Sequence, residues 1–191
     1  MKELTSILVG IIVVSVAFNY FYKNLHLTKV TSTIDMRTYV VRKLPDKLDA
    51  ANKLATISQN LTDLVDHVYK HDRDRDGVHQ LKEKFNSRNI TENAPGGRYT
   101  AYSVNKGEEL SICLRNATDN KFINNNLIIF VSIHELAHVM TDEVGHTEKF
   151  WDNMKYLLEE ASKQGIYNPV DYSKNPTDYC GTEINSTPLN M

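Results

Sequence analysis

The sequence predicts an α+β domain behind one N-terminal transmembrane helix. Several long segments repeat their apolar residues at helical spacing, whereas residues 98–104 and 109–115 contain the β-branched and aromatic residues typical of strands. The chain of 191 residues is long enough for one such domain, and it contains no internal repeat. We therefore expect an anchor over residues 1–23 and a single folded domain over residues 24–191.

The N-terminal segment over residues 6–22 is almost wholly apolar. As a helix it would rise about 27 Å, close to the thickness of the hydrocarbon core of a bilayer. The bulky residues around Tyr22 offer no clear cleavage site, so an uncleaved anchor is favoured over a signal peptide. Lysine and arginine are more frequent after this segment than before it. The positive-inside rule then predicts a single-pass membrane protein whose domain faces the cytosol.

The next elements predicted are a short strand over residues 38–41 and a long helix from Asp46 to His71, which Pro45 is suited to begin. The polar loop after this helix has the spacing of a calcium-binding EF-hand loop, but His79 occupies a position where such loops carry an aliphatic residue. We therefore interpret this loop as a solvated turn between two helices.

Residues 98–104 and 109–115 predict a β-hairpin with its turn at residues 105–107, just before the most specific motif of the chain. The exposed edge of such a hairpin could pair with an extended peptide. The alternative, a hairpin that only covers the core, is equally compatible with the sequence.

That motif is the sequence His-Glu-Leu-Ala-His at residues 134–138. Residues four apart lie on one face of a helix, so His134 and His138 can bind the same metal ion. Glu135 lies beside this pair and outside the ligand set, where a general base belongs. The apolar run over residues 127–133 predicts a buried helix, in which histidine and glutamate are costly unless a metal is bound. We therefore expect a Zn2+ site on this helix.

A third histidine, His146, follows Gly145, a residue suited to the left-handed turn that ends a helix. Residues 148–161 return to helical spacing, so the chain can fold back and bring His146 to the metal. Glu159 or Glu160 is the rival third ligand, because another class of zinc peptidases uses a glutamate from a later helix. His146 is favoured because imidazole suits zinc and the turn delivers it directly.

This motif, followed by Gly145-His146 and by Phe150 four residues later, resembles the WLM and SprT-like metallopeptidases. The likeness extends over residues 102–156, and the chain also resembles small membrane-anchored proteins of large DNA viruses. The resemblance implies a zincin-like α+β fold. It further implies one catalytic base, Glu135, and three zinc ligands: His134, His138 and His146.

These residues predict a membrane-anchored peptidase that hydrolyses peptide bonds by attack of metal-activated water, with Glu135 as general base. Its expected partners are a protein or peptide substrate and, through the N-terminal helix, a membrane. The alternative is an inactive, zinc-stabilised binding or scaffolding module at a membrane, which would not need a base such as Glu135. A net charge of −2 without an extended basic patch predicts no nucleic-acid partner.

The chain has two cysteines, Cys113 and Cys180, which could pair. Two buried thiols are the favoured interpretation for a domain in a reducing compartment. The tail from residue 164 is rich in glycine and proline and should be mostly irregular. One of its tyrosines could stabilise an oxyanion near the metal, or all could pack with hydrated hydroxyls; the sequence does not select among them. These tyrosines are Tyr167, Tyr172 and Tyr179.

Overall fold

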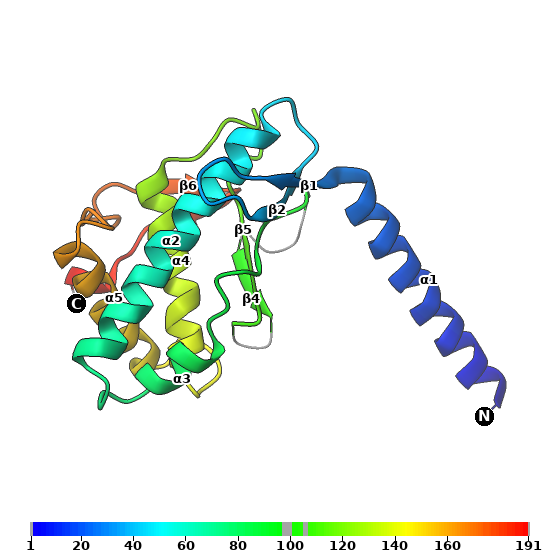
Figure 1. The fold of residues 1–191 in the computed structure, drawn as a ribbon. Helices are drawn as coiled ribbons and strands as arrows, with labels where there is room; N and C mark the ends of the chain where they lie inside the picture. Colours follow the sequence, from blue (N-terminus) through cyan, green and yellow to red (C-terminus); the bar gives the residue numbers. More distant parts are fainter. Residues whose placement is uncertain (1, 97–100, 105–106, 191) are drawn as a thin grey trace.

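A five-stranded sheet with helices packed on it forms the body of the protein, and the computed structural model describes residues 2–96, 101–104 and 107–190 (Figure 1). The helices are α1 (Lys2–His26), α2 (Lys47–His71), α3 (Val78–Lys84), α4 (Asn125–Met140) and α5 (Glu148–Lys163), with a short 3-10 helix η1 (Pro188–Asn190). The strands are β1 (Leu27–Thr31), β2 (Thr38–Arg42), β3 (Ile90–Glu92), β4 (Ala101–Val104), β5 (Glu109–Ile112), β6 (Thr177–Tyr179) and β7 (Thr182–Ile184). The predicted α+β class is confirmed.

The main sheet has the strand order β1-β2-β3-β5-β4. The outer pairs β1–β2 and β4–β5 are antiparallel, whereas β3 runs parallel to both β2 and β5. The predicted hairpin is therefore present as β4 and β5, with Ser103 opposite Leu110. Its first residues, 98–100, and most of its turn lie outside the described residues. Because β4 is last in the strand order, it forms one edge of the sheet.

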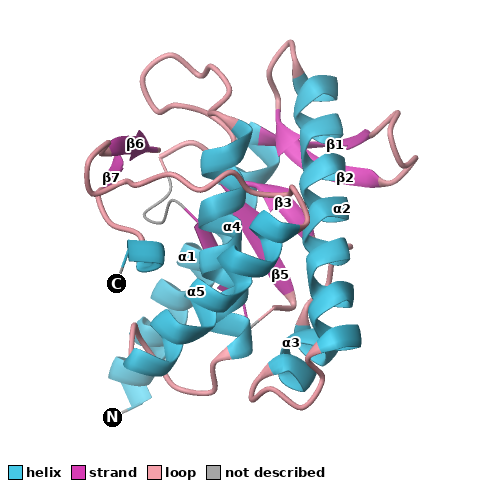
Figure 2. Cartoon of the chain, turned by 90° about the vertical axis from the view of Figure 1, so that its left-hand side faces the viewer, coloured by secondary structure: helices cyan, strands magenta, loops and turns pink. Residues whose placement is uncertain are grey.

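Helices α2, α4 and α5 lie on one side of this sheet (Figure 2). Helix α2 packs on β2 and β3, α4 packs on β4 and β5, and α5 packs on α4. The bounds of α2 and α5 agree with the predicted helices over residues 46–71 and 148–161 to within two residues. Two N-caps begin the helices near the motif: the side chain of Asn124 accepts from the backbone of Asn126 in α4, and that of Thr147 accepts from Phe150 in α5.

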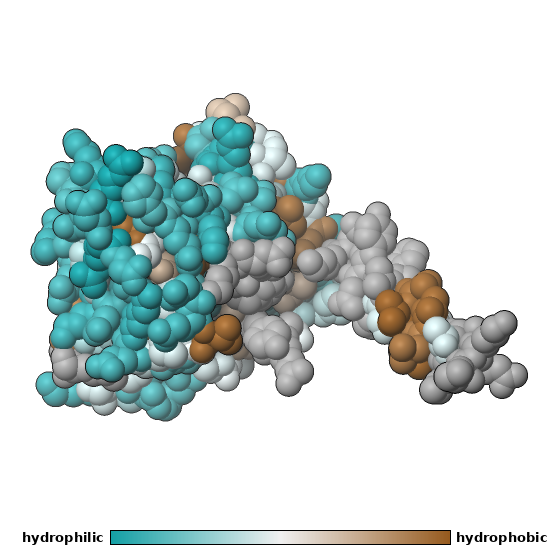
Figure 3. Space-filling view, turned by 90° about the horizontal axis from the view of Figure 1, so that it is seen from below, coloured by the Kyte–Doolittle hydropathy of each residue, from teal (hydrophilic) through white to brown (hydrophobic). Residues whose placement is uncertain are grey.

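Helix α1 projects away from the body of the protein (Figure 1). Its described apolar side chains are solvent-exposed and make a hydrophobic surface (Figure 3). Among the described residues, no helix combines the length and the apolar character needed to cross a bilayer, so the structure does not support the expected span over residues 6–22.

The tail contains a small hairpin, β6–β7, whose turn is made by Cys180 and Gly181 with φ of 55° and 85°. This turn places Cys180 against Cys113, which directly follows β5, and the two residues form a disulfide with their Cα atoms 6.5 Å apart. The expectation of two buried thiols is therefore wrong. The contact joins residues 67 positions apart and depends on how the tail folds back over β5, which no local pattern records.

The loop between α2 and α3 is the solvated turn that the sequence favours. Asp72 ends α2 and Gly77 precedes α3. Two of the aspartates with EF-hand spacing are bonded to protein groups, because Asp72 accepts from the hydroxyl of Tyr156 at 2.6 Å and Asp76 pairs with Lys149 at 2.7 Å.

Gly77 fixes this loop against the end of α4, and we expect Gly77→Ala to lower the free energy of unfolding by roughly 2–4 kcal/mol. Gly77 has a φ of 81°, and a Cβ there would lie 2.2 Å from the carbonyl oxygen of Met140. Urea denaturation measures the change, with Gly165→Ala as control, because Gly165 has a similar φ of 70° but open space around its Cα. Equal losses in both variants would show that backbone strain alone, and not the contact with α4, matters.

Candidate metal centre

The structure brings His134, His138 and His146 into one cluster. One potential ligand atom from each histidine lies within 4.8 Å of the other two, and the Nε2 atoms of His134 and His146 are 3.1 Å apart. The three ring centroids are each 4.9 Å from the other two. Three nitrogens this close can face a single metal ion.

The period of α4 explains the first two members of the cluster. From residue 127 to residue 140 every residue is buried except His134 and His138, which are partly exposed. An almost wholly apolar helix thus lies in the core and presents to the surface only the two imidazoles that share one of its faces. This is the buried helix that the apolar run predicts.

A loop and an aromatic side chain bring in the third member. Gly145 has a φ of 90°, a left-handed conformation that lets the chain reverse after α4, and Thr147 then begins α5. Phe150, in the first turn of α5, is fully buried against the three imidazoles, with centroid distances of 4.9, 4.3 and 4.7 Å to His134, His138 and His146. The ring of Phe150 therefore packs the loop that carries His146 against α4.

The protonation state of His134 suits metal binding. Burial lowers the pKa of His134 to about 3, and the neighbouring His138 and His146 act in the same direction. A neutral imidazole with a lone pair available is the form that binds a metal. A histidine set of this composition, with its nitrogens gathered at one point, fits Zn2+.

Glu135 follows the first histidine but is directed into the protein, where only 7% of its surface is exposed. Tyr179 lies near enough for the two side chains to interact electrostatically. Glu135 is thus next to the histidine cluster in sequence but is not one of the residues grouped to hold a metal.

The two glutamates considered as rival ligands lie elsewhere on α5. Glu160 is buried and pairs with His67 at 3.3 Å and with Lys163 at 2.5 Å. Glu159 is exposed. Within the part of the chain that the structure describes, the group able to hold a metal consists of the three histidines alone.

The three tail tyrosines pack in the core, as one alternative expected, but they are buried rather than packed with hydrated hydroxyls. Tyr167 and Tyr172 pack against Phe130, with ring centroids 6.0 and 4.7 Å away. The hydroxyl of Tyr179 donates to the carbonyl oxygen of Cys113 at 3.0 Å.

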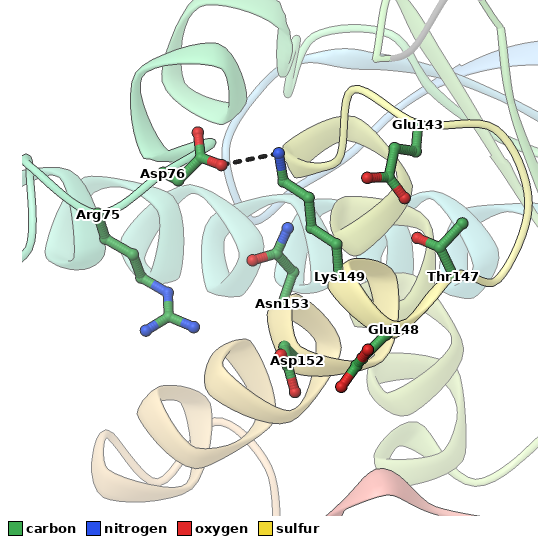
Figure 4. Close-up of a pocket in the computed structure, with 8 residues that line it drawn as sticks. All are labelled: Arg75, Asp76, Glu143, Thr147, Glu148, Lys149, Asp152 and Asn153. Carbon is green, nitrogen blue, oxygen red and sulfur yellow. Dashed lines mark ion pairs between the residues drawn. The ribbon is translucent and has the colours of Figure 1, made fainter.

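Sequence reasoning missed an ion-pair bridge beside the cluster. Lys149 pairs with Asp76 at 2.7 Å (Figure 4) and also with Asp142 at 2.8 Å. Both carboxylates raise the pKa of Lys149. The bridge connects the α2–α3 loop to the loop that carries His146. It borders an open pocket of about 720 Å³ whose lining residues are Arg75, Asp76, Glu143, Thr147, Glu148, Lys149, Asp152 and Asn153. No local signal could have found it, because Asp76 is distant in sequence.

The fold and the cluster together define an α+β domain with a centre of three histidines, two on α4 and one in the loop before α5. The chain matches the WLM domain family over residues 34–187 and belongs to this family, which confirms the resemblance seen in the motif.

Its relatives include proteins of large DNA viruses. The chain is 35% identical over 159 residues to the uncharacterized protein R325 of Acanthamoeba polyphaga mimivirus, covering 81% of each chain. It is 37% identical over 83 residues to the uncharacterized protein 136R of Invertebrate iridescent virus 6, covering 42% of this chain and 44% of the relative. The solved structure of a Wss1 mutant from Saccharomyces cerevisiae has the same fold, with a TM-score of 0.50 and 23% identity over 66% of this chain and 91% of that chain.

Proposed function

We propose that this protein is a zinc metallopeptidase in which His134, His138 and His146 bind the metal and Glu135 is the general base. The observation that carries the proposal is the gathering of three imidazoles within 4.8 Å, next to a buried glutamate that is not one of them. Membership of the WLM family supports the same class of activity.

The bound zinc would supply a Lewis acid and lower the pKa of water to about 7. Glu135 then takes the proton of the attacking water and passes it to the leaving amine. The substrate would be a protein or peptide, and the edge strand β4, which packs beside α4, offers backbone groups to which an extended peptide could pair.

The purified chain should bind about one zinc ion, and His146→Ala should lose most of it because two imidazoles make an incomplete site. Metal analysis of the folded protein tests this. Glu159→Gln and Glu160→Gln are the matched controls on α5 and should keep the metal. Zinc retained by His146→Ala but lost by either glutamate variant would show that a glutamate is the third ligand. Circular dichroism separates loss of metal from loss of fold.

We also propose, from the sequence alone, a single-pass membrane protein whose domain faces the cytosol. The support is the excess of lysine and arginine after residue 22. In eukaryotic cells the full chain should resist carbonate extraction from membranes and carry no glycan on its four acceptor sites. Release by carbonate would overturn the anchoring, and a glycan would overturn the orientation. The acceptor sites are Asn60, Asn89, Asn116 and Asn185.

A further inference from the structure

Three residues tie the tail to the end of β5, and we call Cys113, Tyr179 and Cys180 the tail clamp. Cys113 is held twice: its sulfur is bonded to Cys180, and its carbonyl oxygen accepts from the hydroxyl of Tyr179 at 3.0 Å. Tyr179 is fully buried, and Cys113 is nearly so. Tyr179 therefore has little freedom to move, because its ring is buried and the next residue, Cys180, is covalently bonded to Cys113.

The clamp reaches the proposed catalytic base. Helix α4, which carries Glu135, packs on β5, the strand that ends one residue before Cys113. Burial raises the pKa of Tyr179, and the negative charge of Glu135 raises it further. The two buried side chains therefore lie within electrostatic range of each other, on elements that the packing of α4 on β5 brings together.

The disulfide adds a covalent hold to this arrangement. Strands β6 and β7 have three residues each, and an isolated two-stranded hairpin is marginally stable at best. The bond joins residues 67 positions apart, and the loop that it closes contains α4, α5 and all three histidines of the cluster. Without it, the tail would lose its covalent hold at the residue next to Tyr179.

We propose that the tail clamp positions Glu135 for proton transfer and that reduction of the Cys113–Cys180 disulfide releases it, which makes the activity redox-sensitive. A dithiol reductant supplies two electrons and two protons: the S–S bond breaks, each cysteine becomes a thiol, and the dithiol becomes a disulfide. Tyr179 is a positioning residue in this proposal, which rests on the proposed peptidase function.

The test compares the oxidised, zinc-loaded full chain with Cys180→Ser, which cannot form the bond. With kcat normalised to zinc-bound chains, Cys180→Ser should show at least a tenfold lower kcat with KM within about twofold, because a displaced base slows the chemical step. Wild type reduced by a dithiol that is then removed under nitrogen should behave like Cys180→Ser. An unchanged kcat in both would overturn the proposal.

Tyrosine variants separate positioning from general stability. Tyr179→Ala keeps the disulfide but removes the ring, so it should lose as much kcat as reduction does and respond no further to reduction. Tyr179→Phe keeps the ring and should retain most of the activity. Tyr172→Ala, the same truncation elsewhere in the tail, should keep its response to reduction. A Tyr179→Ala protein with normal kcat would contradict the role of the ring.

Amide hydrogen exchange gives a readout that does not depend on activity. Loss of the disulfide should speed exchange in the β6–β7 hairpin and in the turn of α4 around Glu135, but not in α2. Faster exchange in the hairpin alone would show that the clamp does not reach the base. If the oxidised wild type hydrolyses no peptide, the peptidase proposal fails, and the exchange result still decides whether the clamp controls this turn of α4.

Discussion

Glu135→Gln is expected to lower the rate of peptide hydrolysis by about a hundredfold or more, with zinc content and folding near those of the wild type. The amide has the shape of the carboxylate but lacks its basicity, so the proton of the attacking water has no acceptor. Glu135 is only 7% exposed, and the change removes a charge from the interior without altering its volume. Steady-state kinetics on a peptide substrate, metal analysis and thermal unfolding measure the three quantities.

The matched control is Glu159→Gln, the same chemical change at an exposed position of α5, which should leave the hydrolysis rate unchanged. A fully active Glu135→Gln protein would contradict the mechanism. A wild-type protein that binds zinc but cleaves no member of a broad peptide library would favour the alternative function, a zinc-stabilised binding module.

The histidine cluster could be predicted because its geometry is mostly local. The helical period puts His134 and His138 on one face of α4, and Gly145 allows the reversal that returns His146. The packing of Phe150 against all three rings could not be derived from spacing alone, since it requires the angle between α4 and α5. The assignment of these residues to zinc and catalysis stays a prediction.

The long, periodic helices were also predicted well, and so were the short strands β2, β4 and β5, but β1 and β3 were not. Helix α2 has enough turns to show its apolar stripe, whereas β1 and β3 have five and three residues and owe their conformation to pairing with distant strands. Ile90 of β3, for example, lies opposite Leu110 of β5. The disulfide and the pair between Lys149 and Asp76 likewise join residues that are distant in sequence, so no local pattern predicts them.

A buried network of charges at the end of the sheet belongs to this class of unpredicted contacts. Arg115 and Glu92 are each 1% exposed, and Arg115 donates to Glu92 at 2.9 Å. Arg115 also donates two hydrogen bonds to Asp46, at 2.7 and 2.9 Å, and stacks over the ring of Phe122 at 4.1 Å. The backbone N–H of Arg42 donates to the second oxygen of Glu92 at 2.7 Å. One guanidinium thus links β3, the start of α2 and the segment between β5 and α4.

The network should respond to pH through Asp46. The hydrogen bonds from Arg115 lower the pKa of Asp46 below its ordinary value of 3.8. A carboxyl group whose pKa is lowered by folding stabilises the folded state fully above its unfolded pKa, and this contribution is lost as the pH falls through the folded pKa. The contribution of this pair is therefore present at neutral pH and disappears only in acid.

Removing the guanidinium should have the largest effect on stability of any change considered. We expect Arg115→Ala to lower the free energy of unfolding by about 3–5 kcal/mol at neutral pH, because it removes the closer of the two guanidinium partners of buried Glu92 and leaves only Arg42, at 3.8 Å. Urea denaturation measures this, and Lys121→Ala is the control, since Lys121 pairs with Asp119 at the surface with 80% of its side chain exposed and should cost less than about 1 kcal/mol. Arg115→Met keeps much of the volume but leaves buried Glu92 with Arg42 alone as its charged partner, so it should also be destabilised, and adding Glu92→Gln to it should restore part of the loss. If Arg115→Met were as stable as the wild type, packing over Phe122 rather than charge compensation would explain why an arginine lies at this position.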